Sequence, residues 1–243
     1  IPMVEEGDLE KYSKSYEYSN LDDHKDEFKF YFIGEHVPRK NIEALVVAFN
    51  AEFGSHEPVR LIIKANITGK DEEEVLSILD DDINKIKVDC KLYHTNSMYK
   101  SEILIPVRLT EEEMMGLHDT CDCFVMPSRG EAFCMPAFDA IAFGSYTIHV
   151  RGNGIREYIY GNQGDGVDST LVPCRCDTRP IEYLYTSRDN WADINILSLQ
   201  HSMRTAFNRK SRSDKQLRKE WAAANVLPQY TSQAIAEKIE ERL

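Results

Sequence analysis

Residues 127–144, with the sequence PSRGEAFCMPAFDAIAFG, decide how this chain is interpreted. They follow the apolar run 123–126, which has the length and character of a buried strand. A polar turn comes next, and Pro136 then suits the first turn of a helix, where its missing N–H is not needed. Open α/β sheets place ligands just beyond the carboxyl ends of their strands. The free N–H groups of this turn could therefore hold an oxygen-rich or anionic group.

Two acidic residues belong to this segment. Glu131 lies in the turn, and Asp139 follows eight residues later in the first turns of the expected helix. Two carboxylates at one helix mouth can accept hydrogen bonds from different hydroxyls of one ligand, such as a sugar or a ribose. The residues alone also allow a plainer interpretation, in which one acid belongs to the turn and the other to a solvated helix face.

Strands and helices alternate along most of the chain. Apolar runs typical of strands are separated by segments with the periodicity of amphipathic helices. This pattern predicts an α/β fold, with a Rossmann-like parallel sheet and helices on both faces. The expected strands are 28–33, 59–64, 103–109, 123–126 and 146–150, and the expected helices include 42–53, 71–87 and 110–118.

The two ends of the chain give weaker patterns. Residues 1–27 are polar and acidic, and we interpret them as a linker or N-terminal surface excursion. Residues 161–190 are expected to form loops, and Trp191 is expected to begin a helix. A last helix is expected from Thr231.

A basic loop follows the first expected strand. Arg39 and Lys40 precede the helix 42–53, and they suit a diphosphate as a planar fork and a point charge respectively. Lys64, at the end of the next strand, could add a third positive charge at the same sheet edge. Basic residues in such places are also common on ordinary surfaces, so both interpretations remain open. The turn lacks the G-x-G-x-x-G pattern, which argues against a nicotinamide cofactor.

Composition limits the classes of partner. The formal net charge of −12 argues against nucleic acid or an anionic membrane as the main partner. No apolar run approaches the roughly 20 residues that a transmembrane helix needs. The 6 cysteines include two Cys-x-Cys pairs, whose gap is shorter than in the usual zinc sites. No metal is therefore expected, and reduced, mostly structural thiols would suit a cytoplasmic protein.

The segment Ser128-Arg129-Gly130-Glu131-x7-Asp139, ending in Ala-Ile-Ala-Phe-Gly, resembles the E-x7-E segment of family 4 glycosyltransferases (glycosyl transferases group 1). The resemblance extends from about Phe28 to Met203. It implies one half of a GT-B fold, in which residues 28–243 form the donor-binding domain. Ile1-Pro2 resembles the point where the first domain of that family leads into the second, so an N-terminal acceptor domain would be missing. Any peripheral attachment to a membrane would then lie in that absent domain.

The resemblance implies a function and a reaction. A sugar would pass from a nucleotide diphosphate, UDP- or GDP-linked, to a hydroxyl of a glycan or another acceptor. The anomeric configuration would be retained, and neither a metal nor another cofactor would be needed. Glu131 would hold the hydroxyls of the donor sugar, and Asp139 would hold those of the ribose. Lys40, with Arg39 or Lys64, would offset the charge that develops on the leaving diphosphate.

The resemblance also implies the remaining donor-binding residues, together with three departures. The backbone N–H groups of Phe133 and Cys134 would line the sugar pocket, beside Met135. Val107 and Arg108 match the position that cradles the base. Where the family has an arginine, a glutamate and a Gly-Phe-Gly turn, this chain has respectively Glu35, the shorter Asp139 and Ala132-Phe133-Cys134.

Two other functions remain open at this stage. The chain could be a module that binds a sugar nucleotide without transferring the sugar. It could also be another enzyme on the same architecture, such as a sugar-nucleotide epimerase, which would need its own acid and base. His36 and His118 are the histidines near the expected strand ends, and we interpret both as structural or surface residues.

Overall fold

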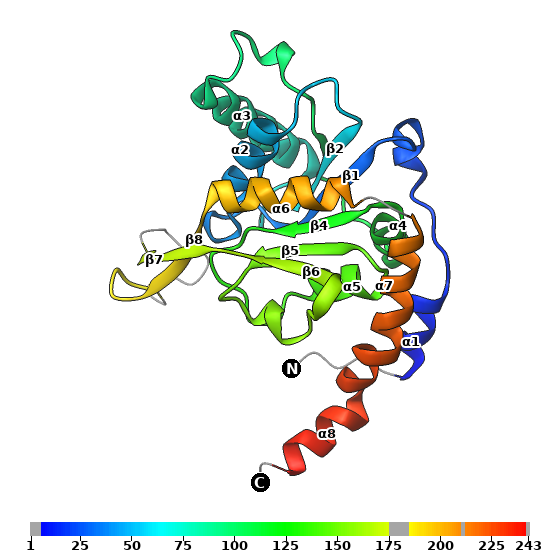
Figure 1. The fold of residues 1–243 in the computed structure, drawn as a ribbon. Helices are drawn as coiled ribbons and strands as arrows, with labels where there is room; N and C mark the ends of the chain where they lie inside the picture. The colour runs from blue at the N-terminus through cyan, green and yellow to red at the C-terminus, as the bar shows by residue number, and fades with distance from the viewer. Residues whose placement is uncertain (1–5, 175–184, 210–211, 242–243) are drawn as a thin grey trace.

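The computed structural model describes residues 6–174, 185–209 and 212–241. Six parallel strands form one sheet in the order β3-β2-β1-β4-β5-β6 (Figure 1). The order reverses between β1 and β4, as in a Rossmann-like domain, which confirms the predicted fold class. The strands are β1 (Phe28–Glu35), β2 (Val59–Asn66), β3 (Ile103–Ile105), β4 (Cys123–Met126), β5 (Tyr146–Val150) and β6 (Gly164–Val167).

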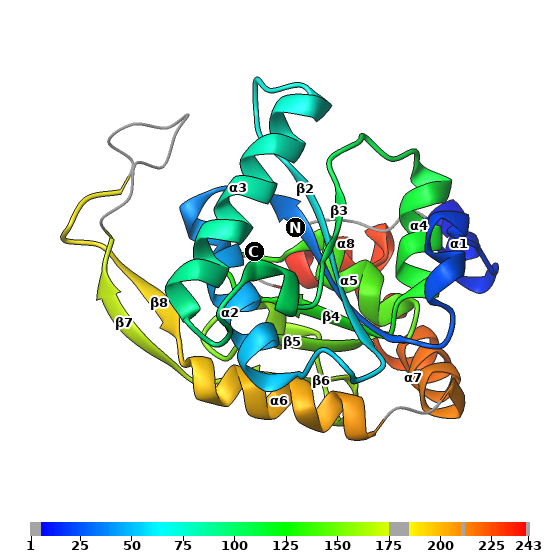
Figure 2. The same ribbon diagram turned by 90° about the horizontal axis from the view of Figure 1, so that it is seen from above.

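Helices cover the sheet in two groups. Helices α3 and α6 pack against α2, whereas α4 and α7 pack against α5. Figure 2 shows the first group on one side of the sheet and the second group on the other, as right-handed crossovers require. The α-helices are α1 (Glu6–Ser13), α2 (Ile42–Glu52), α3 (Glu72–Cys90), α4 (Glu111–Thr120), α5 (Met135–Ala142), α6 (Ile196–Asn208), α7 (Arg212–Asn225) and α8 (Ser232–Glu240).

Short elements complete the chain. An antiparallel hairpin of β7 (Ser169–Pro173) and β8 (Asn190–Ile194) projects from the edge of the domain (Figure 1). The 3-10 helices are η1 (Ser19–His24), η2 (Pro38–Lys40), η3 (Asn96–Met98), η4 (Gly154–Glu157), η5 (Gly161–Gln163) and η6 (Leu227–Tyr230).

Strand β1 occupies the centre of the sheet because both of its faces are apolar. Phe30, Tyr31 and Phe32 are successive residues and are all fully buried, which is the pattern of a strand covered on both sides. The strand pairs along its whole length with β2, from Phe28 opposite Val59. It pairs with β4 on its other edge. The carboxyl ends of β1 and β4 are therefore neighbours.

Helix α4 begins with a capping box, which the sequence Thr110-Glu111-Glu112-Glu113 indicates by itself. The Thr110 side chain accepts a hydrogen bond from the N–H of Glu113, whose carboxylate accepts one from the N–H of Thr110 in return. Asp71 and Glu74 form the same arrangement at the start of α3. Each box satisfies N–H groups that the first turn of a helix would otherwise leave unpaired.

The element predictions were wrong in three places. The strand expected at 103–109 ends at Ile105. The segment 161–190 contains β6 and β7 as well as loops, although 175–184 lies outside the described residues. Trp191 belongs to strand β8, and α6 begins at Ile196, where the Asn195 side chain accepts a hydrogen bond from the N–H of Ser198. The N-cap of this helix therefore lies four residues beyond Trp191.

The N-terminal segment is attached to the domain more firmly than a surface excursion would be. Tyr12, Tyr18 and Leu21 are each at most 5% exposed and belong to the main hydrophobic core. Gly116 of α4 makes room for the segment, because a Cβ added there would lie 2.6 Å from the carbonyl oxygen of Glu17. The anchors follow no helical or strand period, so periodicity alone could not reveal them.

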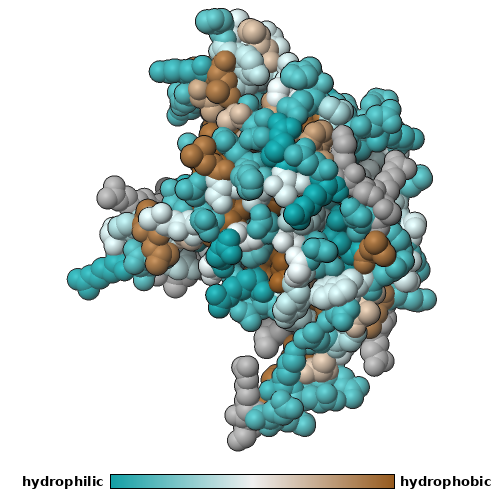
Figure 3. All heavy atoms as spheres, viewed as in Figure 1, coloured by the Kyte–Doolittle hydropathy of each residue, from teal (hydrophilic) through white to brown (hydrophobic). Residues whose placement is uncertain are grey.

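The face seen in Figure 3 is mostly hydrophilic, and its apolar residues form separate small patches. This agrees with the high proportion of charged residues, 29% of the chain. In the part of the chain that the structure describes, no helix is both long and apolar enough to cross a membrane.

Arg204 anchors α6 to the end of α2 and the loop that follows. Its Nε atom lies 2.7 Å from Glu52 Oε1, and its Nη1 atom lies 2.5 Å from Glu57 Oε2. Its guanidinium carbon lies 4.4 Å from the ring centroid of Phe53. The hydrogen bond from Arg204 lowers the pKa of Glu57 from 4.5 to about 2.

Because of this ion pair, we expect the free energy of unfolding to depend on pH in the acidic range. The folded-state pKa of Glu57 lies below the unfolded value of 4.5, so its contribution is complete above that pH and is lost as the pH falls towards about 2. Glu57→Gln should lower the free energy of unfolding by about 1 kcal/mol at neutral pH. Urea denaturation at about pH 3 should give less than half of that difference. If the loss of unfolding free energy in Glu57→Gln were the same at both pH values, the ion-pair assignment would be wrong. It would also be wrong if the losses in Glu57→Gln and Arg204→Gln were fully additive in the double variant.

Candidate functional site

The turns that follow β1 and β4 are hydrogen-bonded to each other. The N–H of Arg129 donates to the carbonyl oxygen of Arg39 over 2.8 Å. The Ser128 hydroxyl donates to the same oxygen over 3.2 Å. The side-chain amide of Asn41 reaches the carbonyl oxygen of Pro127. The two turns therefore form one structure at the point where the strand order reverses, which is where open α/β sheets bind ligands.

A carboxylate and two cations meet in this structure. Glu131 Oε1 lies 2.8 Å from Arg39 Nη1 and 2.7 Å from Lys40 Nζ. The Glu131 side chain is 8% exposed, that of Lys40 is 13% exposed, and that of Arg39 is 35% exposed. Pairing offsets the cost of removing these charges from water. No described residue hydrogen-bonds to Glu131 Oε2, so this oxygen is available to a ligand.

The turn after β5 is hydrogen-bonded to the backbone of Glu131. The Asn153 side chain accepts a hydrogen bond from the N–H of Glu131 and donates one to the carbonyl oxygen of Ser128. The N–H of Gly154 donates to the carbonyl oxygen of Glu131 over 3.0 Å. A Cβ added at Gly154 would lie only 1.8 Å from the carbonyl oxygen of Ala132. Only glycine allows the two turns to approach this closely.

Helix α5 begins with unpaired donors. The N–H groups of residues 132–135 have no hydrogen-bond partner among the described residues. Cys134 precedes the helix with φ of 64°, in the left-handed region, which aims the chain into α5. Its thiol is buried, and burial raises its pKa to about 12. Free N–H groups at a helix start can hold an anionic or oxygen-rich group, as the sequence predicts.

Aromatic side chains support this helix start. Phe133 packs against Phe138, Tyr158 and Tyr230, with ring centroids 4.8 to 5.5 Å away. The Tyr158 hydroxyl contacts the carbonyl oxygens of Phe133 and Cys134. Burial raises the pKa of Tyr158, so it remains a neutral donor.

The two acids of the E-x7-E segment both lie near Tyr158. The negative charges of Glu131 and Asp139 both contribute to the raised pKa of Tyr158, after burial and the Cys134 thiol. Both carboxylates therefore act on one hydroxyl. Asp139 also accepts a hydrogen bond from the N-terminal segment, since the Tyr12 hydroxyl donates to its Oδ1 atom over 2.6 Å.

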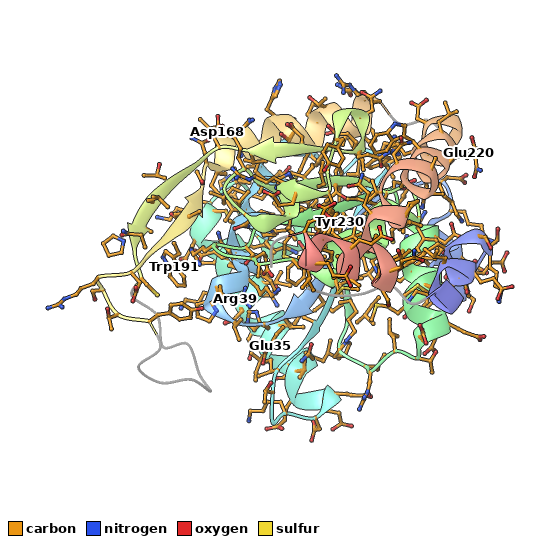
Figure 4. The ribbon with its side chains drawn as sticks, turned by 90° about the horizontal axis from the view of Figure 1, so that it is seen from below. Glu35, Arg39, Asp168, Trp191, Glu220 and Tyr230 are labelled. Atoms are coloured by element: carbon orange, nitrogen blue, oxygen red, sulfur yellow. The ribbon has the colours of Figure 1, made fainter. Side chains whose placement is uncertain are left out.

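The β7–β8 hairpin is tied to the same turns. Arg129 Nε lies 3.0 Å from Asp193 Oδ1, and its guanidinium carbon lies 5.1 Å from the ring centroid of Trp191. The N–H of Ala192 donates to the carbonyl oxygen of Arg129. In the view of Figure 4, Arg39 and Trp191 of this hairpin lie on the same side of the molecule.

The remaining predicted residues that the structure describes make no hydrogen bond or ion pair with the side chains of Glu131, Arg39 and Lys40. Lys64 is 7% exposed in β2, where burial lowers its pKa and the charge of Glu72 partly opposes the shift. Val107 and Arg108 are exposed in the loop after β3, and the N–H of Arg108 donates to Glu72. Met135 is 38% exposed at the start of α5. Glu35, at the position of the family's arginine, accepts a hydrogen bond from the Thr68 hydroxyl.

The two candidate histidines lie outside this cluster. His118 is fully buried and contacts the Tyr31 hydroxyl, and burial lowers its pKa to about 3. His36 lies 2.8 Å from Asp82 on α3. Their surroundings match the structural and surface interpretations.

The described cysteines do not form a metal site. Burial raises the pKa of the Cys121 and Cys123 thiols. Among the described residues, which exclude Cys176, no group of His, Cys, Asp and Glu is arranged to hold a metal ion.

Sequence reasoning did not identify Tyr12, Arg129, Asn153 and Tyr158 as parts of the site. The pair of glycines around Asn153 was a usable signal, because a glycine-rich turn after a strand often marks a close backbone approach. Tyr12 is 127 residues away from its partner, and no local pattern could have connected the two.

The structure thus combines a Rossmann-like α/β sheet with a carboxylate, two cations and free N–H groups at its switch point, a set of groups that is chemically suited to phosphorylated or hydroxyl-rich ligands. Residues 19–172, more than half of the chain, match the family described as glycosyl transferases group 1. The chain belongs to this family of glycosyltransferases.

Three known proteins illustrate the similarity. The serotype-specific mannosyltransferase WbdA of Escherichia coli is 29% identical over 114 residues, which are 46% of this chain and 12% of that protein. The C-terminal domain of the glycosyl transferase group 1 family protein LpcC of Francisella tularensis superposes with a TM-score of 0.51 and 15% identity, covering 94% of this chain and 97% of that domain. Anabaena Alr3699/HepE in complex with UDP-glucose superposes with a TM-score of 0.58 and 14% identity, covering 96% of this chain and 53% of that protein. The chain thus spans about half of HepE and a small part of WbdA.

We predict that Gly154→Ala disrupts the site, whereas Gly152→Ala does not. The new Cβ at 154 would overlap the carbonyl oxygen of Ala132, whereas a Cβ at 152 would meet open space. Gly154→Ala should lower the free energy of unfolding by more than about 2 kcal/mol, and Gly152→Ala should change it by less than about 0.5 kcal/mol. Urea denaturation of both variants tests this. Equal losses would show that the close approach does not constrain the turn.

Proposed function

We propose that this chain is the donor-binding half of a retaining family 4 glycosyltransferase with a GT-B fold. The observation that carries the proposal is the cluster of Glu131, Arg39 and Lys40 beside the free N–H groups at the start of α5. A nucleotide diphosphate sugar offers a matching set of groups, because it presents two phosphates and several hydroxyls. The UDP-glucose in the HepE structure agrees with a donor of this class.

The two cations would hold the diphosphate of a UDP- or GDP-linked donor. Arg39 and Lys40 contact Glu131, so the phosphates would compete with that carboxylate for the two cations. Lys64 lies on the neighbouring strand and would add a longer-range positive charge. As the sugar leaves, negative charge grows on the diphosphate, and preorganised cations stabilise that charge without a metal ion.

The carboxylates and the turn would hold the sugar and the ribose. Glu131 Oε2 would accept hydrogen bonds from donor sugar hydroxyls, and the N–H groups of Phe133 and Cys134 would line the pocket beside Met135. Asp139 would accept those of the ribose. Val107 and Arg108 lie in the loop after β3, where they would border the base.

The proposed reaction exchanges one bond for another. The bond between the anomeric carbon and the diphosphate oxygen breaks, and the electron pair leaves with the diphosphate. The acceptor hydroxyl oxygen bonds to the same face of that carbon, and its proton passes to the departing phosphate. An N-terminal domain would bind the acceptor, which we expect to be a glycan or another hydroxyl compound. We expect the reaction to take place in the cytoplasm.

A second candidate is a module that binds a sugar nucleotide without transferring the sugar. The observation that favours it is the pairing of Glu131 with Arg39 and Lys40, which occupies one oxygen of the carboxylate that would hold the donor sugar. Nucleotide binding and sugar transfer should both be measured, for this chain and for a complete enzyme as the reference. Binding without transfer in both proteins would favour the module.

Glu131 and Lys40 give opposite predictions for nucleotide binding. Lys40→Gln removes a partly buried cation and should weaken UDP or GDP about 10- to 100-fold, the usual range for a charge-assisted hydrogen bond. Glu131→Gln removes the competing carboxylate, so the nucleotide should bind at least as tightly as before, whereas sugar transfer by the full-length enzyme should fall. Calorimetric titration with UDP, GDP and ADP measures the first two effects.

Lys25→Gln is a matched control. Lys25 forms an exposed pair with Asp22 near the amino end of β1, at the opposite edge of the sheet, and its loss should leave nucleotide affinity unchanged. If no nucleotide binds to the folded chain or to a full-length enzyme, the proposed function is wrong. If Lys40→Gln binds the nucleotide as tightly as the wild type does, Lys40 does not contribute to donor binding.

A further inference from the structure

The N-terminal segment reaches the proposed donor site through one side chain. The Tyr12 hydroxyl donates to Asp139 Oδ1 across 2.6 Å. This length is typical of a hydroxyl that donates to an ionised carboxylate. Tyr12 belongs to α1, whereas Asp139 lies in the second turn of α5. The contact therefore joins the segment before β1 to the helix that begins at the donor turn.

The Tyr12 ring is held firmly. It is 3% exposed, and its centroid lies 5.6 Å from that of Phe143, in an edge-to-face arrangement. Lys11 Nζ lies 5.1 Å from the same ring and 3.5 Å from Glu111 on α4. A buried ring has few alternative rotamers, so its hydroxyl stays in one place.

The backbone after Tyr12 is anchored as well. The N–H of Tyr16 donates to Asp119 over 2.9 Å, and the N–H of Tyr18 donates to the Thr120 hydroxyl. Lys219 of α7 contacts the carbonyl oxygen of Lys14. Helices α4 and α7 thus fix the segment that carries the phenol.

Asp139 has a shorter reach than a glutamate at the same position would have. An aspartate has one methylene fewer, so its carboxylate lies closer to the helix backbone and has a shorter reach. A short hydrogen bond to one oxygen fixes the side-chain torsion of Asp139. A carboxylate held in one orientation binds a hydroxyl pair with a smaller loss of entropy.

We propose that Tyr12 is a positioning residue, which orients the Asp139 carboxylate towards the ribose hydroxyls of the nucleotide. This inference rests on the proposed function, because it takes Asp139 as the ribose-binding acid. It adds that nucleotide affinity depends on a residue outside the Rossmann-like domain. The phenol acts through Asp139 and does not itself touch the ligand.

The test compares ribose discrimination in two variants of the full chain. The probes are the nucleoside diphosphate that binds best and its 2′-deoxy analogue, titrated by calorimetry. The wild type should prefer the ribose form about tenfold, which is the value of one hydrogen bond to a charged group. Tyr12→Phe removes a single oxygen atom and should reduce the preference to about threefold, while Asp139→Ala should abolish it.

Two controls separate positioning from packing. Tyr16→Phe alters a second tyrosine whose ring lies 5.9 Å from the Phe143 ring, and it should keep the wild-type preference. Adding Tyr12→Phe to Asp139→Ala should change the preference no further, because both substitutions act on one contact.

The outcomes are distinguishable. A Tyr12→Phe chain that is less stable but keeps the tenfold preference would overturn the inference and leave the proposed function intact, since the phenol would then only pack. Equal affinity of the wild type for both probes would overturn the role of Asp139 and the inference together. If the wild type binds no nucleotide at all, the proposed function itself fails.

Discussion

The site depends on the desolvated charge of Glu131. A carboxylate that is 8% exposed requires opposite charge nearby, and Arg39 and Lys40 supply it from the neighbouring turn. Because both cations lie in η2, the pairing holds the turn after β1 against the turn after β4. The ion pairs therefore determine the shape of the switch point as well as its charge. A phosphorylated ligand would enter a site whose cations are already placed and partly shielded from water.

The backbone around this charge is correspondingly constrained. Gly154 lies so close to Ala132 that a side chain at 154 would not fit. Cys134 adopts a left-handed conformation that non-glycine residues seldom use. Non-glycine residues in this conformation occur often at ligand sites, where the surrounding packing stabilises them. Here the packing comes from Tyr158 and the aromatic cluster around it.

The segment before β1 contributes to the site rather than only preceding the domain. Tyr12 is buried beside α5 and bonded to Asp139, and Tyr16 and Tyr18 are tied to the end of α4. The proposed domain boundary at residue 28 follows the start of the sheet. The hydrogen bonds cross that boundary, so the folded unit extends to α1.

The fold class, the central strands, the capping box at Thr110 and the family could be predicted without a structure, because these follow from local periodicity and from one short motif. The sequence also placed Glu131 and Lys40 at strand ends on the same sheet edge, although their separate roles remain predictions. It misplaced Trp191, because an apolar residue just before a helical stripe can belong to either element. Only the tertiary structure decided that Glu131 pairs with both cations and that Tyr12 bonds to Asp139. Such contacts depend on where distant segments meet, and short-range patterns carry no information about that.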